Sequence, residues 1–181
     1  MVISAFELVL LTSALLALCS IVYYTLKTGI SPMPSSAKAR AEVWQFLAQV
    51  SPRPKQTIVD LGSGWGGLVI PLALRFPECQ IVGYELSWLP WFTSKVIQRV
   101  LRLHNLKLYR QNFLQQPLPS ADIVVCYLYP EGMTKLADQG RVQHWRPSYL
   151  ISICFALPNH NALEKVKVSD FYQTPVYLYR L

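Results

Sequence analysis

Residues 57–67 read Thr-Ile-Val-Asp-Leu-Gly-Ser-Gly-Trp-Gly-Gly, and this stretch decides the fold. A short apolar strand runs into closely spaced glycines, and the apolar residues after Gly67 read as the beginning of a helix. Strand, glycine turn and helix in this order are typical of a parallel α/β sheet that presents its backbone to a nucleotide-like ligand. Gly62, Gly64 and Gly67 also fit the dinucleotide pattern G-x-G-x-x-G, so the turn alone does not separate a dinucleotide from another adenosine cofactor.

The composition indicates one domain beside a membrane. A chain of 181 residues is long enough for a single domain with a substantial core. Hydrophobic residues make up 52% of it and charged residues only 15%, which is apolar for a water-soluble chain. The net charge of +7 suits a nucleic acid or an anionic membrane surface, and the apolar N-terminus favours the membrane. The four cysteines include no C-x-x-C pair, so we expect no metal site and no disulfide framework, and a reducing compartment fits best.

The N-terminus is predicted to be a transmembrane anchor. Residues 8–26 carry no charge, and at about 1.5 Å per residue the apolar run is long enough to cross a hydrocarbon core of roughly 30 Å. No basic region precedes the run, which disfavours a cleaved signal peptide, and a helix lying in the membrane interface is the main alternative. The basic residues Lys27, Lys38 and Arg40 follow the run, so the positive-inside rule predicts a single-pass protein with its domain on the cytoplasmic side.

A short linker separates the predicted anchor from the domain. The expected boundaries of anchor, linker and domain are residues 1–27, 28–36 and 37–181. Pro32 and Pro34 disfavour a helix in the linker. Ser35 or Ser36 is expected to cap the helix that follows.

Beyond residue 56, apolar strands alternate with amphipathic stretches. The predicted strands are 57–61, 80–85, 106–110, 122–128, 149–155, 164–169 and 175–180. The predicted helices are 37–50, 66–76, 88–104 and 131–140. Strands separated by helices imply right-handed crossovers and a mostly parallel sheet. Residues 170–174 are too few for a crossover helix, so the last two strands are expected to form an antiparallel hairpin.

The segment Val59-Asp60-Leu61-Gly62-Ser63-Gly64-Trp65-Gly66 resembles the first motif of class I S-adenosylmethionine-dependent methyltransferases, in which an acidic residue stands two positions before the first glycine. These enzymes have a seven-stranded Rossmann-like sheet that ends in a reversed hairpin, as the C-terminus here predicts. A nicotinamide-binding fold usually has an apolar residue in place of Asp60 and needs a further substrate domain, so the dehydrogenase alternative is disfavoured.

More narrowly, the chain resembles the membrane-anchored protein-lysine methyltransferases that act on mitochondrial ATP synthase subunit c and on the adenine nucleotide translocator. The resemblance rests on the apolar N-terminus, Pro34-Ser35 before a helix, the Asp60 motif, and Gly83-Tyr84-Glu85-Leu86 before a Trp-rich helix start. It implies methyl transfer from S-adenosylmethionine to a lysine of a membrane protein, with the lipid bilayer as a further partner. Two alternatives stay open: methylation of a small or lipid-like amphiphile, and a non-catalytic membrane-tethered module that binds S-adenosylmethionine.

The resemblance also implies the residues of a cofactor site. Asp60 would favour the ammonium group of the methionine part, and Glu85 would accept hydrogen bonds from the ribose hydroxyls. Backbone N–H groups would wrap the methionyl and ribose portion, from Gly62, Ser63, Gly64 and Gly66. Asn112 stands where the class often has an acid that contacts the adenine amino group, and it keeps an acceptor oxygen. Phe113 would lie against the adenine face.

Tyr129 and Pro130 are the predicted catalytic residues. They follow the fourth strand, where amino-methylating relatives carry an Asn/Asp-Pro-Pro-aromatic motif, and the missing Asn/Asp disfavours methylation of nucleic-acid bases. The hydroxyl of Tyr129 would orient a lysine amine for in-line attack on the sulfonium methyl. Desolvation, rather than a dedicated strong base, would lower the pKa of that amine, so that it releases its proton to solvent and attacks in the neutral form.

The predicted helix 88–104 has basic residues at helical spacing. Lys95, Arg99 and Arg102 recur along it, beside an apolar face that contains Val96, Val100 and Leu103. We interpret the basic residues as a solvated stripe, with contact to anionic lipid as the alternative.

Overall fold

The computed structural model describes residues 35–181 without a gap, together with residues 4, 6–8, 10–12, 15, 18, 19, 22 and 23. Most of the predicted anchor and linker therefore lies outside the described residues. None of the helices traced in the described part of the chain is both long and apolar enough to cross a bilayer.

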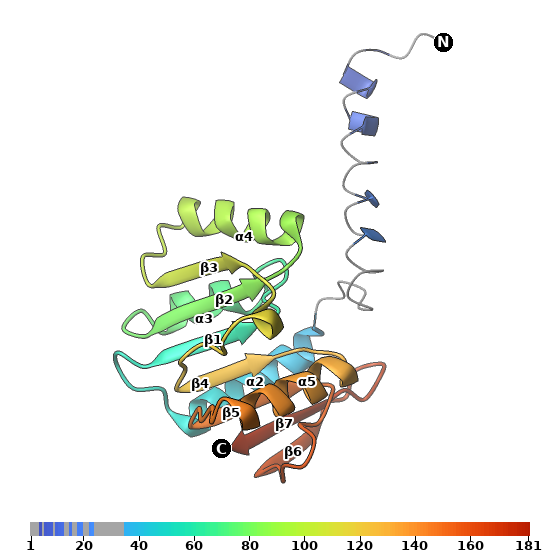
Figure 1. The fold of residues 1–181 in the computed structure, drawn as a ribbon. Helices are drawn as coiled ribbons and strands as arrows, with labels where there is room; N and C mark the ends of the chain where they lie inside the picture. Colours follow the sequence, from blue (N-terminus) through green and yellow to red (C-terminus); the bar gives the residue numbers. More distant parts are fainter. Residues whose placement is uncertain are drawn as a thin grey trace.

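A single seven-stranded sheet forms the centre of the domain (Figure 1), in the order β3-β2-β1-β4-β5-β7-β6. The strands are β1 (Thr57–Leu61), β2 (Gln80–Glu85), β3 (Leu106–Arg110), β4 (Ile123–Cys126), β5 (Tyr149–Ile153), β6 (Glu164–Lys167) and β7 (Pro175–Arg180). Strands β1 to β5 are parallel, and β7 runs antiparallel to both β5 and β6. The predicted mostly parallel sheet with a C-terminal antiparallel hairpin is confirmed.

Helices cover both faces of this sheet. They are α2 (Ala37–Val50), α3 (Val69–Arg75), α4 (Trp88–Val100) and α5 (Pro130–Val142), with a short 3-10 turn η1 (Phe113–Gln115). Successive residues of β1 enter different cores because side chains alternate along a strand. Ile58 packs with α2 and α3, whereas Val59 packs with α5 and η1.

Several elements are shorter than the sequence predicts. The predicted helix 88–104 ends at Val100, and Arg102 just beyond it has a positive φ of 53°. The predicted strand 149–155 ends at Ile153 because Cys154 adopts φ 75°, outside the extended range. The predicted strand 122–128 ends at Cys126, where the chain begins its turn into α5.

The start of α2 is attached to the C-terminal hairpin. Of the two predicted caps, Ser35 and Ser36, the N-cap is Ser36. Its Oγ accepts a hydrogen bond from the Ala39 N–H at 3.1 Å. The same hydroxyl donates to Asp170 Oδ2 at 2.7 Å, and Lys38 Nζ donates to the Ser169 carbonyl oxygen. Hydrogen bonds from the Thr174 backbone and from Ser36 lower the pKa of Asp170 to about 2. The ionised carboxylate therefore links α2 to the β6–β7 loop.

Tyr179 connects β7 to the chain that follows β5. Its side chain is only 1% exposed, and its hydroxyl oxygen accepts a hydrogen bond from the Leu157 N–H at 2.9 Å. Leu157 is also buried. This bond satisfies a backbone donor inside the core.

Replacing Tyr179 with Phe should lower the free energy of unfolding by about 1–3 kcal/mol, because the buried Leu157 N–H loses its acceptor. Urea denaturation followed by circular dichroism measures the change. Tyr177→Phe on the same strand is the matched control, since its ring stacks on Tyr179 at 6.2 Å and would be kept; we expect a change within about 0.5 kcal/mol. Equal losses in the two variants would contradict this role of Tyr179.

Candidate functional site

The glycine turn follows β1 at the carboxyl edge of the parallel strands and is attached to the end of β2. The N–H groups of Gly62 and Ser63 both donate to the Tyr84 carbonyl oxygen at 2.9 Å. The Gly64 N–H donates to Glu85 Oε2 at 2.9 Å, and the Gly66 N–H donates to the Ser63 carbonyl oxygen at 3.0 Å. The predicted contact of these four N–H groups with a cofactor stays a prediction, because in this structure they hold the turn itself.

Glycine is required at two close approaches around this turn. Gly66 has φ +83°, and a Cβ there would lie 2.5 Å from Ile70 Cδ1. A Cβ at Gly83, in β2, would lie 2.7 Å from Leu108 Cδ2 and 3.0 Å from Ser63 Oγ. The turn and β2 are therefore packed without room for a further carbon atom.

Asp60 is a buried acid at the centre of the site. It pairs with Gly83 of β2 on one side and with Val125 of β4 on the other, and its side chain is only 4% exposed. Burial, and to a smaller extent the negative charge of Glu85, raise the pKa of Asp60 to about 7. A positively charged ligand would stabilise the two neighbouring carboxylates of Asp60 and Glu85.

Ser63 contributes a hydroxyl without a partner. The residue is 6% exposed, and its Oγ has no hydrogen-bond partner among the residues that the structure describes. Buried hydroxyl groups are usually hydrogen-bonded. Together with the two acids, this hydroxyl fits a ligand that carries positive charge and polar atoms.

Glu85 ends β2 and uses both carboxylate oxygens. Oε2 accepts from Gly64, and Oε1 accepts from the Ser87 N–H at 2.6 Å, just before α4. The Gln111 N–H donates to the Glu85 carbonyl oxygen at 3.1 Å, which brings the end of β3 beside it. Glu85, the residue predicted to bind the ribose hydroxyls, is thus bonded to the glycine turn, to the start of α4 and to the end of β3.

The predicted adenine contacts lie next along the chain. Asn112 caps η1, since its Oδ1 accepts a hydrogen bond from the Leu114 N–H at 3.1 Å. The acceptor oxygen assigned to adenine therefore has a local partner. Phe113 is buried in the core on the α5 side of the sheet. Both residues follow Gln111, whose N–H is bonded to Glu85, and their adenine contacts stay predictions.

The predicted catalytic residues stand on the other side of β1, where β4 ends. Tyr129 is the N-cap of α5, and Pro130 occupies its first turn. A Cβ at Gly132 would lie 3.0 Å from Tyr129 Cε1, so the absence of a side chain there gives the ring its place on α5. Leu128 reaches the glycine turn, where its Cδ2 would contact a Cβ at Gly62 at 3.7 Å. The strand order therefore puts Glu85 and Tyr129 on opposite sides of Asp60.

Sequence reasoning missed Ser94 of α4. This serine is fully buried, and its Oγ donates to the Gly64 carbonyl oxygen at 3.2 Å. It fixes the helix against the glycine turn. A serine among the apolar residues of a helix was the available signal, but its partner lies 30 positions away in the chain.

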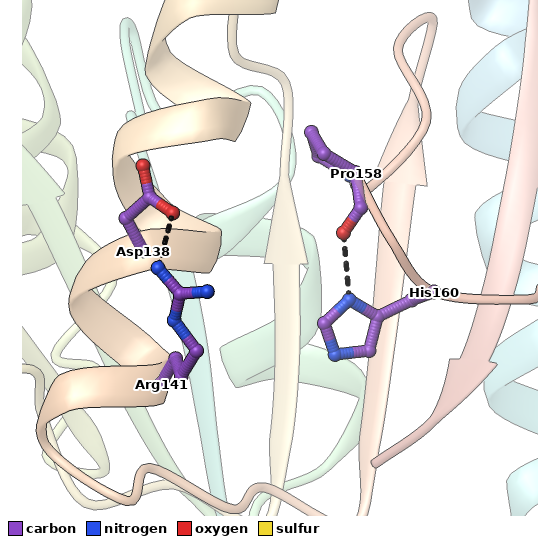
Figure 2. Close-up of polar contacts among 4 residues, drawn as sticks. All are labelled: Asp138, Arg141, Pro158 and His160. Atoms are coloured by element: carbon purple, nitrogen blue, oxygen red, sulfur yellow. Dashed lines mark hydrogen bonds and ion pairs between the residues drawn. The ribbon is translucent and has the colours of Figure 1, made fainter.

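The histidines lie outside this constellation. His104, His144 and His160 are all exposed. His160 Nδ1–H donates to the Pro158 carbonyl oxygen at 2.8 Å, and Arg141 pairs with Asp138 of α5 at 3.3 Å. Both contacts are drawn in Figure 2. These are local surface contacts, and exposed pairs of this kind contribute little to stability.

A hollow of about 460 Å³ lies at the amino ends of the parallel strands, opposite the glycine turn. Its lining includes Gln56, Ile123 and Tyr149, at the amino ends of parallel strands, together with Arg180 at the end of the antiparallel β7. Ligands of open α/β sheets bind at the carboxyl ends of the strands. We therefore place the cofactor site at the glycine turn and not in this hollow.

Comparison with known families now decides the class of protein. The family described as "ANTKMT methyltransferase domain" matches residues 60–164, which is more than half of the chain. The chain belongs to this methyltransferase family. The match begins at Asp60 and includes Glu85, Asn112 and Tyr129. No curated protein matches the chain.

Solved structures share the methyltransferase fold. An RNA methyltransferase from Salinibacter ruber, in complex with S-adenosyl-L-homocysteine, has a TM-score of 0.68 at 20% identity, covering 82% of this chain and 93% of that one. Magnesium protoporphyrin IX methyltransferase (ChlM) from Synechocystis PCC 6803, with bound S-adenosylmethionine, has a TM-score of 0.62 at 21% identity and 78% coverage of both chains. The putative methyltransferase yhhF from Escherichia coli has a TM-score of 0.64 at 16% identity, covering 80% of this chain and 86% of that one.

The predicted methyltransferase class, with S-adenosylmethionine as the methyl donor, is confirmed. When bound, this cofactor supplies an electrophilic methyl group on a sulfonium. The chain's own contribution would be a negative, polar setting: Asp60 and Glu85 for positive charge and hydroxyls, and the unpartnered Ser63 Oγ for a further polar atom.

Affinity for S-adenosylmethionine should fall as the pH drops below about 7. Below its raised pKa, the Asp60 carboxyl must release a proton before it can pair with an ammonium group, so affinity decreases up to about tenfold per pH unit and is flat above. Isothermal titration calorimetry across this range measures the effect. In Asp60→Asn the affinity should be weak and independent of pH; a flat profile in the unmodified protein would refute the assignment.

Asp60→Asn should also stabilise the fold at high pH. The folded pKa of about 7 lies above the ordinary 3.8, so the ionised carboxyl destabilises the folded protein as the pH rises between these values. The substitution should raise the free energy of unfolding by up to roughly 4 kcal/mol near pH 8, and have little effect near pH 4. Urea denaturation of Asp60→Asn and of the unmodified protein at the two pH values measures this difference. It also shows whether a weaker affinity of the variant for S-adenosylmethionine comes from the site or from unfolding.

Glu85→Ala should weaken binding of S-adenosylmethionine by about ten- to a hundredfold, because the turn loses its charged acceptor and the ligand loses a hydrogen-bonding carboxylate. Calorimetry at a pH above about 7 keeps Asp60 ionised during the measurement. Glu78→Ala, an exposed acid before β2, is the matched control, and its affinity should not change. Similar losses in both variants would show a general charge effect instead.

Proposed function

We propose that this methyltransferase transfers a methyl group from S-adenosylmethionine to a lysine side chain of a membrane protein. The observation that carries the proposal is the family match over residues 60–164, since the family is that of the adenine nucleotide translocator lysine methyltransferases. It includes every residue assigned to the cofactor and to the acceptor side.

The arrangement of the site supports a mechanism of alignment. Asp60 and Glu85 would hold the cofactor at the ends of β1 and β2, while Tyr129 stands at the end of the neighbouring β4. An amine entering beside Tyr129 would meet a half-buried residue whose hydroxyl can accept or donate a hydrogen bond. Partial burial favours the neutral amine, which is the nucleophile. The protein would thus act by orienting and desolvating the acceptor.

The described part of the N-terminus supports the membrane setting. Large apolar side chains there are exposed, namely Phe6, Leu8, Leu10, Leu11, Leu15, Leu18 and Val22. Exposed apolar surface of this extent marks an interaction site. We therefore propose residues 1–27 as the anchor, with the domain on the cytoplasmic side because Lys27, Lys38 and Arg40 follow the apolar run.

Labelled methyl transfer tests the proposal directly. The full-length protein is incubated with membrane extract and S-adenosylmethionine carrying a radioactive methyl group, and labelled products are separated into protein and lipid fractions. Label on lysine, identified by mass spectrometry, is the expected result. Label in the lipid fraction would replace the proposal by amphiphile methylation, and cofactor binding without any labelled product would indicate the tethered binding module.

Tyr129→Phe should reduce kcat by about ten- to a hundredfold and leave the affinity for S-adenosylmethionine unchanged, because only the orienting hydroxyl is removed. Initial-rate assays and calorimetry measure the two quantities. Tyr127→Phe, two residues earlier, packs toward the core on the α2 side and serves as the matched control. Unchanged kcat in Tyr129→Phe, or an equal loss in the control, would remove Tyr129 from the acceptor side.

A further inference from the structure

The outer surface of α4 is apolar. Trp88, Phe92, Val96 and Val100 recur at every fourth position and are 48%, 45%, 46% and 73% exposed. We call these four residues the α4 ridge. The rings of Trp88 and Phe92 stack with centroids 5.0 Å apart and planes 5° apart. A helix of a soluble domain normally turns such residues toward the core.

The side of α4 toward the domain carries two polar residues, Ser94 and Gln98, beside Trp91 and Ile97, which pack against the core. Ser94 donates to the Gly64 carbonyl oxygen at 3.2 Å, and Gln98 Nε2 donates to the carbonyl oxygens of Leu106 and Leu103. These bonds fix the rotation of the helix about its axis. The α4 ridge is therefore held outward by the same contacts that support the glycine turn.

The surroundings of the α4 ridge are positively charged. Arg99 is exposed on the same side of the helix, and Lys95 lies next to it, where its Nζ donates to Gln98 Oε1 at 3.1 Å. Between Glu85 and Asp122 the sequence contains five Lys and Arg residues and no acidic residue. In Figure 1, α4 lies along the β3 edge of the sheet, outside the other helices. The surface is thus apolar, aromatic and basic together.

We propose that the α4 ridge docks on the surface of an anionic lipid bilayer. An amphipathic helix with Trp and Phe on its apolar side and Lys and Arg beside them is suited to the boundary between headgroups and acyl chains. Charge complementarity favours anionic lipid as the occupant. The proposal rests on the proposed membrane anchoring, which would keep the domain beside a bilayer. Since α4 begins three residues after Glu85, docking would place the cofactor site close to the membrane surface.

Tryptophan fluorescence can report docking of the domain alone. All five tryptophans lie between Trp44 and Trp145, so none belongs to the proposed anchor. The full-length protein is added to vesicles of phosphatidylcholine and phosphatidylglycerol, with or without bromine atoms on the acyl chains near the headgroups. Bromine should quench the emission of the unmodified protein. Trp88→Phe should remove most of this quenching, whereas Trp145→Phe, half-buried beside Pro119, should retain it.

Charge reversal tests the electrostatic part. A basic residue near an anionic surface contributes about fivefold to the partition constant, so Lys95→Glu with Arg99→Glu should reduce the ratio of docked to undocked domain by more than about tenfold. Arg141→Glu on α5 is the matched control and should have no effect. Vesicles of phosphatidylcholine alone should give little quenching. Thermal unfolding of each variant checks that it is folded.

Three outcomes would overturn the proposal. If the protein sediments with vesicles without bromine quenching, the anchor holds and the α4 ridge does not dock. If the protein stays in the supernatant, both the anchoring and the docking are wrong. If the emission of Trp88 changes with protein concentration in detergent without lipid, the ridge binds a second copy of the chain instead. Methyl transfer and cofactor affinity are measured separately, so none of these results refutes the methyltransferase activity.

Discussion

The carboxylate of Glu85 is the interaction on which the site depends. One oxygen accepts from the Gly64 N–H and the other from the Ser87 N–H, so a single side chain holds the glycine turn and the entrance to α4. Hydrogen bonds to an ionised acceptor are stronger than those between neutral groups. Ser94 completes this arrangement from inside α4 by donating to the Gly64 carbonyl oxygen. The position of the proposed cofactor site and the orientation of the proposed membrane surface thus have a common origin.

The second acid makes the site unfavourable without a ligand. Asp60 is buried beside the negative charge of Glu85, and burial is the main reason for its raised pKa. A fold selected only for stability would replace it with a neutral residue. Retaining an acid there costs stability and gains affinity for a cation, a balance often found at functional sites.

The sequence was sufficient to locate all seven strands, the hairpin and both acids, because each depends on a local pattern. It was insufficient where the backbone adopts a positive φ. Cys154 and Arg102 have such values, which shorten β5 and α4, and neither residue type indicates a positive φ in a sequence. The N–H groups of Gly62, Ser63 and Gly64 have partners in β2, which the local pattern does not reveal. Their predicted contact with a cofactor stays a prediction. Spacing along the predicted helix 88–104 grouped Val96 and Val100 with Leu103, yet only Leu103 is buried. Leu103 lies beyond the end of α4, after Arg102 has turned the chain with its positive φ.

The attachment of α2 to the β6–β7 loop has a mechanical meaning. A force applied to the N-terminal segment would enter the domain near Ser36 and pass through Asp170 and Lys38 into the C-terminal hairpin. That hairpin is at one edge of the sheet, with β5, β4 and β1 between it and the strand that ends in Glu85. A tether pulled by the membrane would therefore load the hairpin edge of the sheet, with three strands between that edge and the strand that ends in Glu85.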